Sequence, residues 1–208
     1  MSKKTRKKSP SKPSGKPLEA AAKTAARASL KTSKTVSVKK SSSKAPAPAK
    51  TPLAPILSEG QTAPAFDLPR DGGQRASLRD YAGRKLVLFF YPRADTPGCT
   101  KEAIDFSRLA KEFAAAGADV VGASADSSKK QESFRNKHKL QTPLISDEQQ
   151  EMLKAYGVWG EKSMYGRKFL GIIRTTILIA PNGKIARIWR NVKVEGHAEE
   201  VLAAVRSL

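Results

Sequence analysis

The sequence predicts an α/β domain with a mixed central sheet flanked by helices, preceded by a disordered N-terminal tail. In residues 58–208, apolar runs of strand length alternate with helical patterns, which is typical of a sheet with parallel strands. Two later apolar runs are joined by the turn sequence PNGK, which indicates a hairpin. Residues 1–57 are rich in Lys, Ala, Ser and Pro and lack aromatic residues, so they cannot bury enough apolar surface to fold.

The tail carries most of the chain's charge. Residues 1–50 contain 15 Lys and Arg against one acid, Glu19, and so hold +14 of the formal net charge of +20. This density of Lys predicts salt-dependent, sequence-independent nucleic-acid binding through residues 1–50. The alternatives are a purely solubilising extension, an organelle transit peptide and contact with an anionic membrane. The transit peptide is disfavoured because Lys far outnumbers Arg.

The first half of the domain contains two predicted buried strands. A short extended segment, a turn at residues 71–73 and a second short segment come first. The runs KLVLFFY, residues 85–91, and ADVVGASAD, residues 118–126, read as strands buried on both faces. Between them, apolar residues recur at helical spacing from residue 103, and Gly117 ends that helix.

The second half of the domain continues the alternation and ends in a helix. Its expected elements are a helix at 128–138, a strand at 142–146, a helix at 149–156, strands at 175–180 and 184–190, and a helix at 198–208. No apolar run approaches the roughly 20 residues that cross a bilayer. We therefore expect no membrane-spanning segment.

Cys99 is the only cysteine, which excludes an intramolecular disulfide and argues against a disulfide oxidoreductase. It follows Pro97 and Gly98, where an apolar run gives way to a helical pattern. A helix that begins between residues 96 and 99 would place Cys99 in its first turn, where free backbone N–H groups and the helix dipole favour the reactive thiolate. The alternative is a small buried hydrophobic residue. The surrounding residues instead indicate an exposed loop that opens a helix.

The residues around Cys99 resemble a known family. YPRADTPGCT places Pro92, Thr96 and Cys99 in the spacing P-x-x-x-T-x-x-C of the peroxiredoxins. VWGEKSMYGRKFLGIIRTTILIAPNGKI resembles the later segment of the bacterioferritin comigratory protein, or peroxiredoxin Q, subfamily. The resemblance extends over residues 59–208. It implies a thioredoxin-like fold and an antioxidant thiol peroxidase that reduces hydrogen peroxide and organic hydroperoxides with Cys99 as the peroxidatic nucleophile.

The resemblance also assigns roles around the cysteine. Thr96 would offer its hydroxyl to the peroxide, and the backbone amides of Gly98 and Cys99 would donate to it. Pro92 would shield the thiolate from water. Arg174 would stabilise the thiolate and orient the attacked oxygen. From the residues alone, a helix cap for Thr96 and a surface charge for Arg174 are the alternatives.

No cofactor and no metal is implied. His138 and His197 are the two histidines of the chain, have no ligand spacing to each other or to Cys99, and are expected at the surface.

The sequence departs from the subfamily at the second thiol. Many members carry a resolving cysteine five residues after the first, and here that position holds Ile104. We therefore predict a one-Cys cycle in which an external thiol, either thioredoxin or glutaredoxin with glutathione, reduces the sulfenic acid. Alternatives are a peroxide sensor that relays oxidation to a partner and a DNA-associated, non-enzymatic thioredoxin-like protein.

The resemblance favours a monomer or weak dimer. A cytoplasmic protein with nucleoid association is the first expectation for its location, with a nucleus or plastid if the source is eukaryotic.

Overall fold

The computed structural model describes residues 57–164 and 167–208. The expectations of a disordered tail over residues 1–57 and of nucleic-acid binding by residues 1–50 therefore lie outside the described residues, apart from Leu57.

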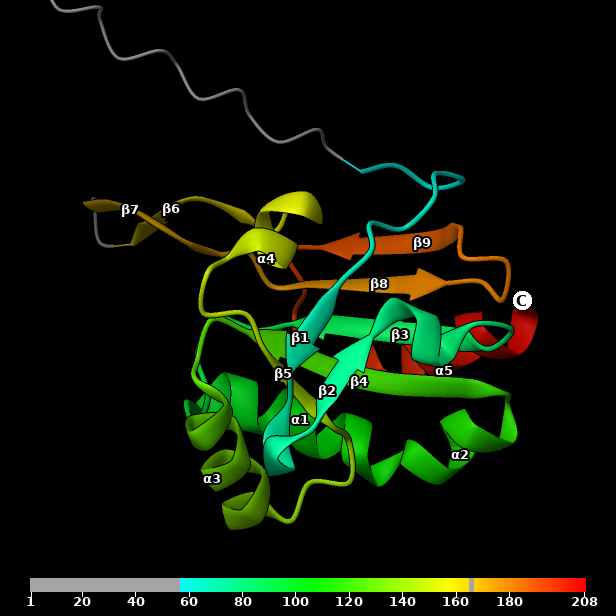
Figure 1. Ribbon diagram of the computed structural model, residues 1–208, viewed down its shortest axis with the longest axis horizontal. Helices are drawn as coiled ribbons and strands as arrows, with labels where there is room; N and C mark the ends of the chain where they lie inside the picture. The colour runs from blue at the N-terminus through cyan, green and yellow to red at the C-terminus, as the bar shows by residue number, and fades with distance from the viewer. Residues whose placement is uncertain (1–56, 165–166) are drawn as a thin grey trace, which may run out of the picture. The chain divides into compact units, whose positions relative to one another are not determined.

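The domain is built around a five-stranded sheet in the order β5-β4-β3-β8-β9 (Figure 1). β3, β4 and β5 run parallel, whereas β8 runs antiparallel to both β3 and β9. The predicted mixed sheet and its hairpin are thus confirmed. The strands are β3 (Lys85–Phe90), β4 (Ala118–Ser124), β5 (Leu144–Ser146), β8 (Thr175–Ile179) and β9 (Ile185–Arg190).

Five α-helices accompany this sheet in the described residues. They are α1 (Pro97–Arg108), α2 (Ala110–Ala115), α3 (Ser128–His138), α4 (Glu151–Ala155) and α5 (His197–Ser207). The single helix predicted before Gly117 is wrong in one respect, because the chain divides into α1 and α2 at Leu109, whose φ of −91° and ψ of 4° depart from helical values.

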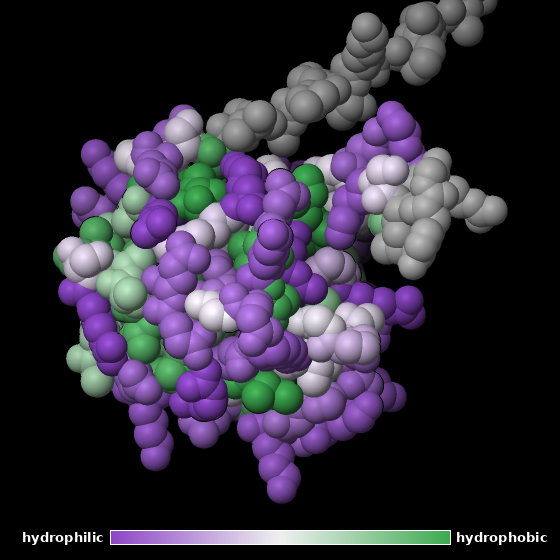
Figure 2. Space-filling view, turned by 180° about the vertical axis from the view of Figure 1, so that it is seen from behind, coloured by the Kyte–Doolittle hydropathy of each residue, from purple (hydrophilic) through white to green (hydrophobic). Residues whose placement is uncertain are grey.

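The sheet separates two hydrophobic cores. Alternate residues of β3 and its continuation, from Val87 to Tyr91, pack with residues of α1, α2, α3 and α5. The intervening residues, from Leu86 to Phe90, pack with residues of α4 and of the N-terminal segment. Side chains of a strand point to alternate faces, so a strand covered on both sides reads as a continuous apolar run. Figure 2 shows the reverse of the molecule as largely hydrophilic, with scattered hydrophobic areas.

Two small hairpins flank the main sheet. The first joins β1 (Asp67–Pro69) to β2 (Arg75–Ser77) around the 3₁₀ helix η1 (Asp71–Gly73), with a second 3₁₀ helix, η2 (Leu78–Tyr81), after it. The second hairpin, β6 (Trp159–Met164) and β7 (Arg167–Ile172), was not predicted. Its strands mix charged residues with exposed Phe169 and Leu170, so they lack the apolar alternation of a half-buried strand.

Among the helices of residues 57–164 and 167–208, none combines the length and apolar character that spanning a bilayer requires.

Candidate active site

Cys99 lies in the first turn of α1, which follows the carboxyl end of β3. The helix begins at Pro97 with Thr96 as its N-cap residue, so the predicted helix start is confirmed. Backbone N–H groups in the first turn of a helix have no acceptor within the helix, and the helix dipole adds positive potential there. The amides of Gly98 and Cys99 lie in this first turn, where they would stabilise a negative charge placed next to them.

The sulfur itself is buried. Cys99 is 1% exposed and belongs to the core that contains Tyr91 and Ala103. The expectation of an exposed position at Cys99 was therefore wrong. Its neighbours Pro97 and Gly98 are exposed, and the cysteine side chain alone turns inward. Because water is largely excluded, the charge of the sulfur depends on the few polar groups that reach it.

Arg174 is the polar group that reaches the sulfur. It lies between β7 and β8, and its Nη2 donates a hydrogen bond to Cys99 Sγ at 3.3 Å. Its Nη1 donates to Glu102 Oε2, and the side chain is 16% exposed. Burial alone would lower the pKa of Arg174, but the charges of Glu102 and Cys99 outweigh it and raise that pKa above the ordinary value. The guanidinium thus stays positively charged beside the thiol.

Glu102 is a component of the site that the sequence reasoning missed. It stands three residues after Cys99 on α1, a spacing that places two side chains on the same helix face. Its side chain is 1% exposed, and its Oε1 has no hydrogen-bond partner among the described residues. Burial raises the pKa of Glu102 to about 7, against the opposing effect of Arg174. The Cys-x-x-Glu spacing was the available signal.

A buried polar network holds the loop before α1. The backbone N–H of Ala94 donates to Asp126 Oδ2 at 2.7 Å, and Ser124 Oγ donates to the same oxygen at 2.9 Å. Gln131 of α3 donates to Ser124 Oγ at 2.9 Å and accepts a hydrogen bond from the Tyr91 hydroxyl. The end of β4 and the first turns of α3 thereby fix the loop that carries the cysteine.

A second anchor holds the same loop from the far end of α3. Asp95 adopts a left-handed backbone conformation with φ of 62°, which Asp tolerates better than most residues. Its carboxylate accepts hydrogen bonds from Lys137 Nζ at 2.6 Å and from His138 Nε2 at 2.7 Å. These contacts lower the pKa of Asp95. The half-buried side chain of His138 thus helps to hold the loop through Asp95.

Thr96 and Pro92 lie on this loop beside Cys99. The Thr96 hydroxyl donates to Arg93 O at 3.1 Å and makes no side-chain capping bond, although Thr96 occupies the N-cap position. The Thr96 hydroxyl therefore does not cap α1, so the alternative role of Thr96 as a side-chain helix cap is wrong. Pro92 is half-buried at the start of the loop. Neither side chain has a described hydrogen bond to the sulfur.

His197 was expected at the surface, and that prediction was wrong. It is 4% exposed, with Nε2 2.8 Å from Thr176 Oγ1 and its ring edge-on to Phe106 and Trp189. Burial lowers the pKa of His197, and the nearby charge of Arg174 adds to this effect. The first turn of α5 packs inward at this point, which a histidine at a helix start does not reveal. Within the described residues, no three His, Cys, Asp or Glu side chains are grouped as metal ligands.

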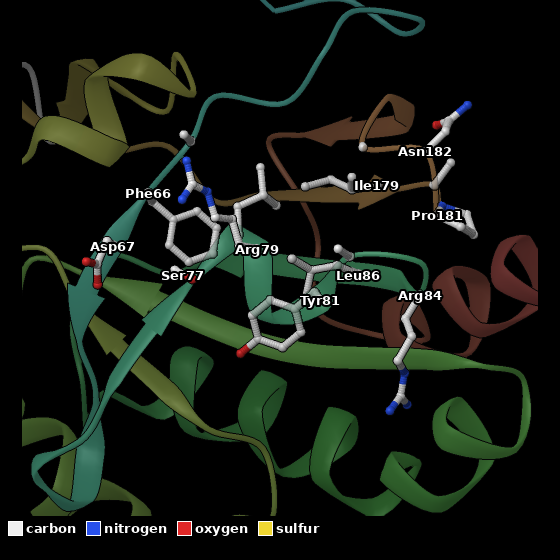
Figure 3. A pocket seen from close by; sticks show the side chains of 15 residues that line it. Phe66, Asp67, Ser77, Arg79, Tyr81, Arg84, Leu86, Ile179, Pro181 and Asn182 are labelled. Carbon is white, nitrogen blue, oxygen red and sulfur yellow. The ribbon is translucent and has the colours of Figure 1, made fainter.

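A cavity of about 710 Å³ lies at the other end of the sheet. Figure 3 shows Phe66, Tyr81, Leu86, Ile179 and Pro181 among its lining residues. Leu86 pairs with Ile179 near the amino end of β3, whereas Cys99 follows the carboxyl end of that strand. None of the residues predicted for the cysteine site lines this cavity, so the hollow and the thiol belong to different regions.

The comparison with protein families matches residues 59–188 to the AhpC/TSA family. Relatives named Peroxiredoxin Bcp support the same family. The protein from Xanthomonas campestris pv. campestris is 46% identical over 147 residues, which cover 70% of this chain and 92% of the relative. The one from Bacillus subtilis is 40% identical over 149 residues, or 72% of this chain and 95% of the relative.

Solved structures agree with this comparison. The bacterioferritin comigratory protein of Xanthomonas campestris, studied for alkyl peroxide reduction activity, superposes with a TM-score of 0.66 at 44% identity, over 68% of this chain and 90% of that chain. A cysteine-to-serine mutant of peroxiredoxin Q from the same organism gives a TM-score of 0.67 at 42% identity, over 74% and 98%. A second mutant of that protein replaces a different cysteine, whereas this chain has one cysteine.

Proposed function

The chain belongs to the AhpC/TSA family and, within it, to the bacterioferritin comigratory protein/peroxiredoxin Q subfamily, and from this we propose a one-Cys thiol peroxidase centred on Cys99. The fold is thioredoxin-like, and family membership supports peroxidase activity in general. The proposal adds the single-cysteine cycle, the substrates and the roles of individual residues.

The observation that carries the proposal is the buried contact between Arg174 Nη2 and Cys99 Sγ at 3.3 Å. A fixed positive charge beside a desolvated sulfur stabilises the thiolate, which is the nucleophile. The first-turn amides of Gly98 and Cys99 are positioned to donate to the peroxide, and the Thr96 hydroxyl can supply a third hydrogen bond. Pro92 and the packed loop limit access of water.

In the proposed reaction, the Cys99 thiolate attacks one oxygen of the hydroperoxide. The S–O bond forms, the O–O bond breaks, and the leaving oxygen takes up a proton to depart as an alcohol, or as water when the substrate is hydrogen peroxide. The product is a sulfenic acid on Cys99. Ile104 occupies the usual position of the resolving thiol, so an external thiol must reduce the Cys99 sulfenic acid. Thioredoxin and glutaredoxin with glutathione are the candidate reductants. Organic hydroperoxides are proposed as substrates because the relative from Xanthomonas campestris was studied for alkyl peroxide reduction.

A turnover experiment tests this function. Peroxide consumption is followed for the wild type and for Cys99→Ser, with thioredoxin and its reductase, glutathione with glutaredoxin, or dithiothreitol supplied in turn. The proposal predicts turnover that disappears in Cys99→Ser, and the reductant that sustains it identifies the resolving thiol. Oxidation of Cys99 without turnover in any arm would instead support a peroxide sensor. An unreactive Cys99 would contradict the peroxidase and leave a DNA-associated scaffold.

A second role is favoured by the charge of the N-terminal segment. Residues 1–50 carry 15 Lys and Arg against one acid. We propose that residues 1–57 form a tail that holds the peroxidase domain, residues 58–208, on nucleic acid within a cytoplasmic nucleoid, through phosphate contacts that weaken as salt rises. A gel-shift titration compares the full chain with a variant that begins at Leu57. Strong salt-dependent binding by the full chain alone supports the tether, and equal binding by both proteins contradicts it.

A further inference from the structure

Lys162 of β6 directs its side chain along the hairpin toward the base of β7. Its Nζ donates to Ile172 O at 2.9 Å, a carbonyl two residues before Arg174. Its Cδ would lie 3.5 Å from a Cβ placed on Gly171, so the side chain crosses the neighbouring strand at this glycine. The ammonium group therefore lies at the base of the β6–β7 hairpin, which projects from the domain beside α4 (Figure 1).

The ammonium of Lys162 and the cysteine site meet at the end of β7, because Lys162 Nζ contacts the carbonyl of Ile172, and Arg174, two residues further on, contacts Cys99 Sγ. Burial and the charge of Arg174 lower the pKa of Lys162, while the charge of the Cys99 thiolate acts to raise it. No carboxylate of the described residues forms an ion pair with Lys162, whereas Lys168 on the opposite strand pairs with Glu161 at 2.9 Å. Lys162 is thus a half-buried cation, and the one opposite charge that acts on its pKa among the described residues is that of the Cys99 thiolate.

Oxidation of Cys99 changes the balance of charge at this place. Before the reaction, the charge of the Cys99 thiolate acts on two cations, Arg174 and Lys162. The sulfenic acid that replaces the thiolate is formally neutral at the sulfur. Arg174 keeps its hydrogen bond to Glu102, whereas Lys162 loses the one opposite charge that acts on it among the described residues. A partly desolvated excess of positive charge attracts anions more strongly than the same charges would in water.

We propose that Lys162, together with Arg174, makes the oxidised site selective for anionic thiols, specifically thiols that carry a carboxylate in addition to the reacting thiolate. This rests on the proposed peroxidase function and names the chemistry of its reductant. The incoming thiolate forms an S–S bond to Cys99 as the S–O bond breaks, and the hydroxide that leaves takes a proton from solvent to become water. A second thiolate then attacks the reductant sulfur of this mixed disulfide, so the bond to Cys99 breaks, the Cys99 thiolate leaves and the disulfide of the reductant is released.

Lys162 thereby becomes a specificity-determining residue for the second half of the cycle. Such selectivity has a chemical reason, because this chain has no resolving cysteine and the reducing thiol has to bind from solution. A small carboxylate-bearing thiol is the class of reductant that the two cations recognise, whereas an amine-bearing thiol is repelled.

Single-turnover kinetics test the proposal with the full chain. The protein is oxidised with one equivalent of hydrogen peroxide and mixed with mercaptoacetate, 2-mercaptoethanol or cysteamine, and formation of the mixed disulfide on Cys99 is followed by quenched mass spectrometry. In Lys162→Gln, the ratio of the mercaptoacetate rate to the cysteamine rate should fall about tenfold relative to the wild type, an order of magnitude expected from Coulomb attraction at intermediate dielectric. Comparing ratios between proteins removes the intrinsic reactivity of each thiol.

Two variants control for fold and net charge. Lys162→Arg keeps the positive charge and should keep most of the wild-type ratio. Lys184→Gln removes an equal charge in the turn between β8 and β9, at the opposite end of the sheet, and should leave the ratio at its wild-type value. The wild-type ratio should also shrink as ionic strength rises.

The outcomes separate this inference from the proposed function. An unchanged ratio in Lys162→Gln, or an equal fall in Lys184→Gln, overturns the role of Lys162 while the peroxidase stands. Failure of the wild-type Cys99 to react with peroxide overturns the proposed function itself, before any thiol is added.

Discussion

The two ends of the central sheet differ in where they place charge and space. At the carboxyl end of β3, Cys99 and Glu102 are each 1% exposed and share the guanidinium of Arg174 in a closely packed site. At the amino end, a cavity of about 710 Å³ has mostly apolar lining residues, and its Arg84 lies at the surface in an ion pair with Asp119. Buried ionisable groups beside a thiol therefore indicate a functional site more strongly than the volume of a cavity does.

The position of Cys99 at this end of the sheet follows from the topology. Loops at the carboxyl ends of parallel strands lead into helix N-termini, where backbone N–H groups point at bound anions. β3 ends at Phe90 and α1 begins at Pro97, so the loop between them brings the cysteine to such a place.

The largest expected effect concerns Arg174. Replacing Arg174 by Met removes the charge beside the sulfur and should lower the rate of Cys99 oxidation by hydrogen peroxide by about 10²–10³, the usual cost of losing one preorganised electrostatic contact. Arg79→Met removes the same charge from the wall of the cavity and should leave this rate within about twofold of the wild type. Stopped-flow measurement of thiol loss compares them. Equal losses in the two variants would end the distinction between the two regions.

The next effect concerns the stability of the reactive end. Because burial raises the pKa of Glu102 from 4.5 to about 7, the folded protein holds the neutral carboxyl more tightly than the unfolded chain does. The stability that this contributes is fully present below pH 4.5 and is lost as the pH rises through about 7. Relative to Glu102→Gln, the wild type should therefore lose about 3 kcal/mol of unfolding free energy over this pH range.

Urea unfolding of both proteins at a series of pH values measures that difference. Below pH 4.5, wild type and Glu102→Gln should be close in stability, since both then carry a neutral side chain at this position. A difference that stays constant with pH would show that Glu102 ionises normally in the folded state. Asp119→Asn, at the surface near the cavity, serves as the control for carboxylate removal.

A smaller effect is expected where the cysteine loop is anchored. Asp126→Asn keeps the shape of the side chain but weakens the hydrogen bond from the Ala94 amide, now 2.7 Å long. A hydrogen bond to a charged group contributes about 1.5–3 kcal/mol, so the melting temperature should fall measurably and Cys99 oxidation should slow several-fold. Differential scanning calorimetry and the oxidation assay give the two readouts. A fall in stability with no change in rate would show that the loop does not position the sulfur.

The smallest effect is expected at the cavity. Tyr81→Phe removes one hydroxyl from its lining, and the Tyr81 hydroxyl has no side-chain hydrogen bond among the described residues. The unfolding free energy should change by about 0.5 kcal/mol or less, and the oxidation rate should not change. A loss of peroxidase activity in Tyr81→Phe would connect the two ends of the sheet.

The sequence predicted the framework of the fold and part of the site. Apolar runs such as residues 85–91 revealed the buried strands because a strand covered on both faces has no polar alternation. The β6–β7 hairpin went unpredicted because it buries neither face fully. The helix start at Pro97 followed from local chemistry, whereas the contact between Cys99 and Arg174 spans 75 residues and rested on family resemblance.

The burial of individual site residues could not be predicted from the local sequence. His197 and Cys99 both stand among polar or small residues, yet both are buried because their helices pack inward at the first turn. Glu102 could have been predicted as a site residue from its spacing of three residues from Cys99 on the same helix. The position of Lys162 depends on how the hairpin folds over Gly171, which no local pattern indicates.

The proposed peroxidase cycle requires that peroxide oxidise Cys99 to a sulfenic acid that persists until an external thiol reduces it. The most direct measurement treats the reduced full chain with one equivalent of hydrogen peroxide in the presence of dimedone, followed by intact and peptide mass spectrometry. One dimedone adduct per chain is expected, located on Cys99, and the free thiol should return when an external thiol replaces dimedone. Quantitative disulfide dimers through Cys99, or an unmodified thiol after exposure to peroxide, would contradict it.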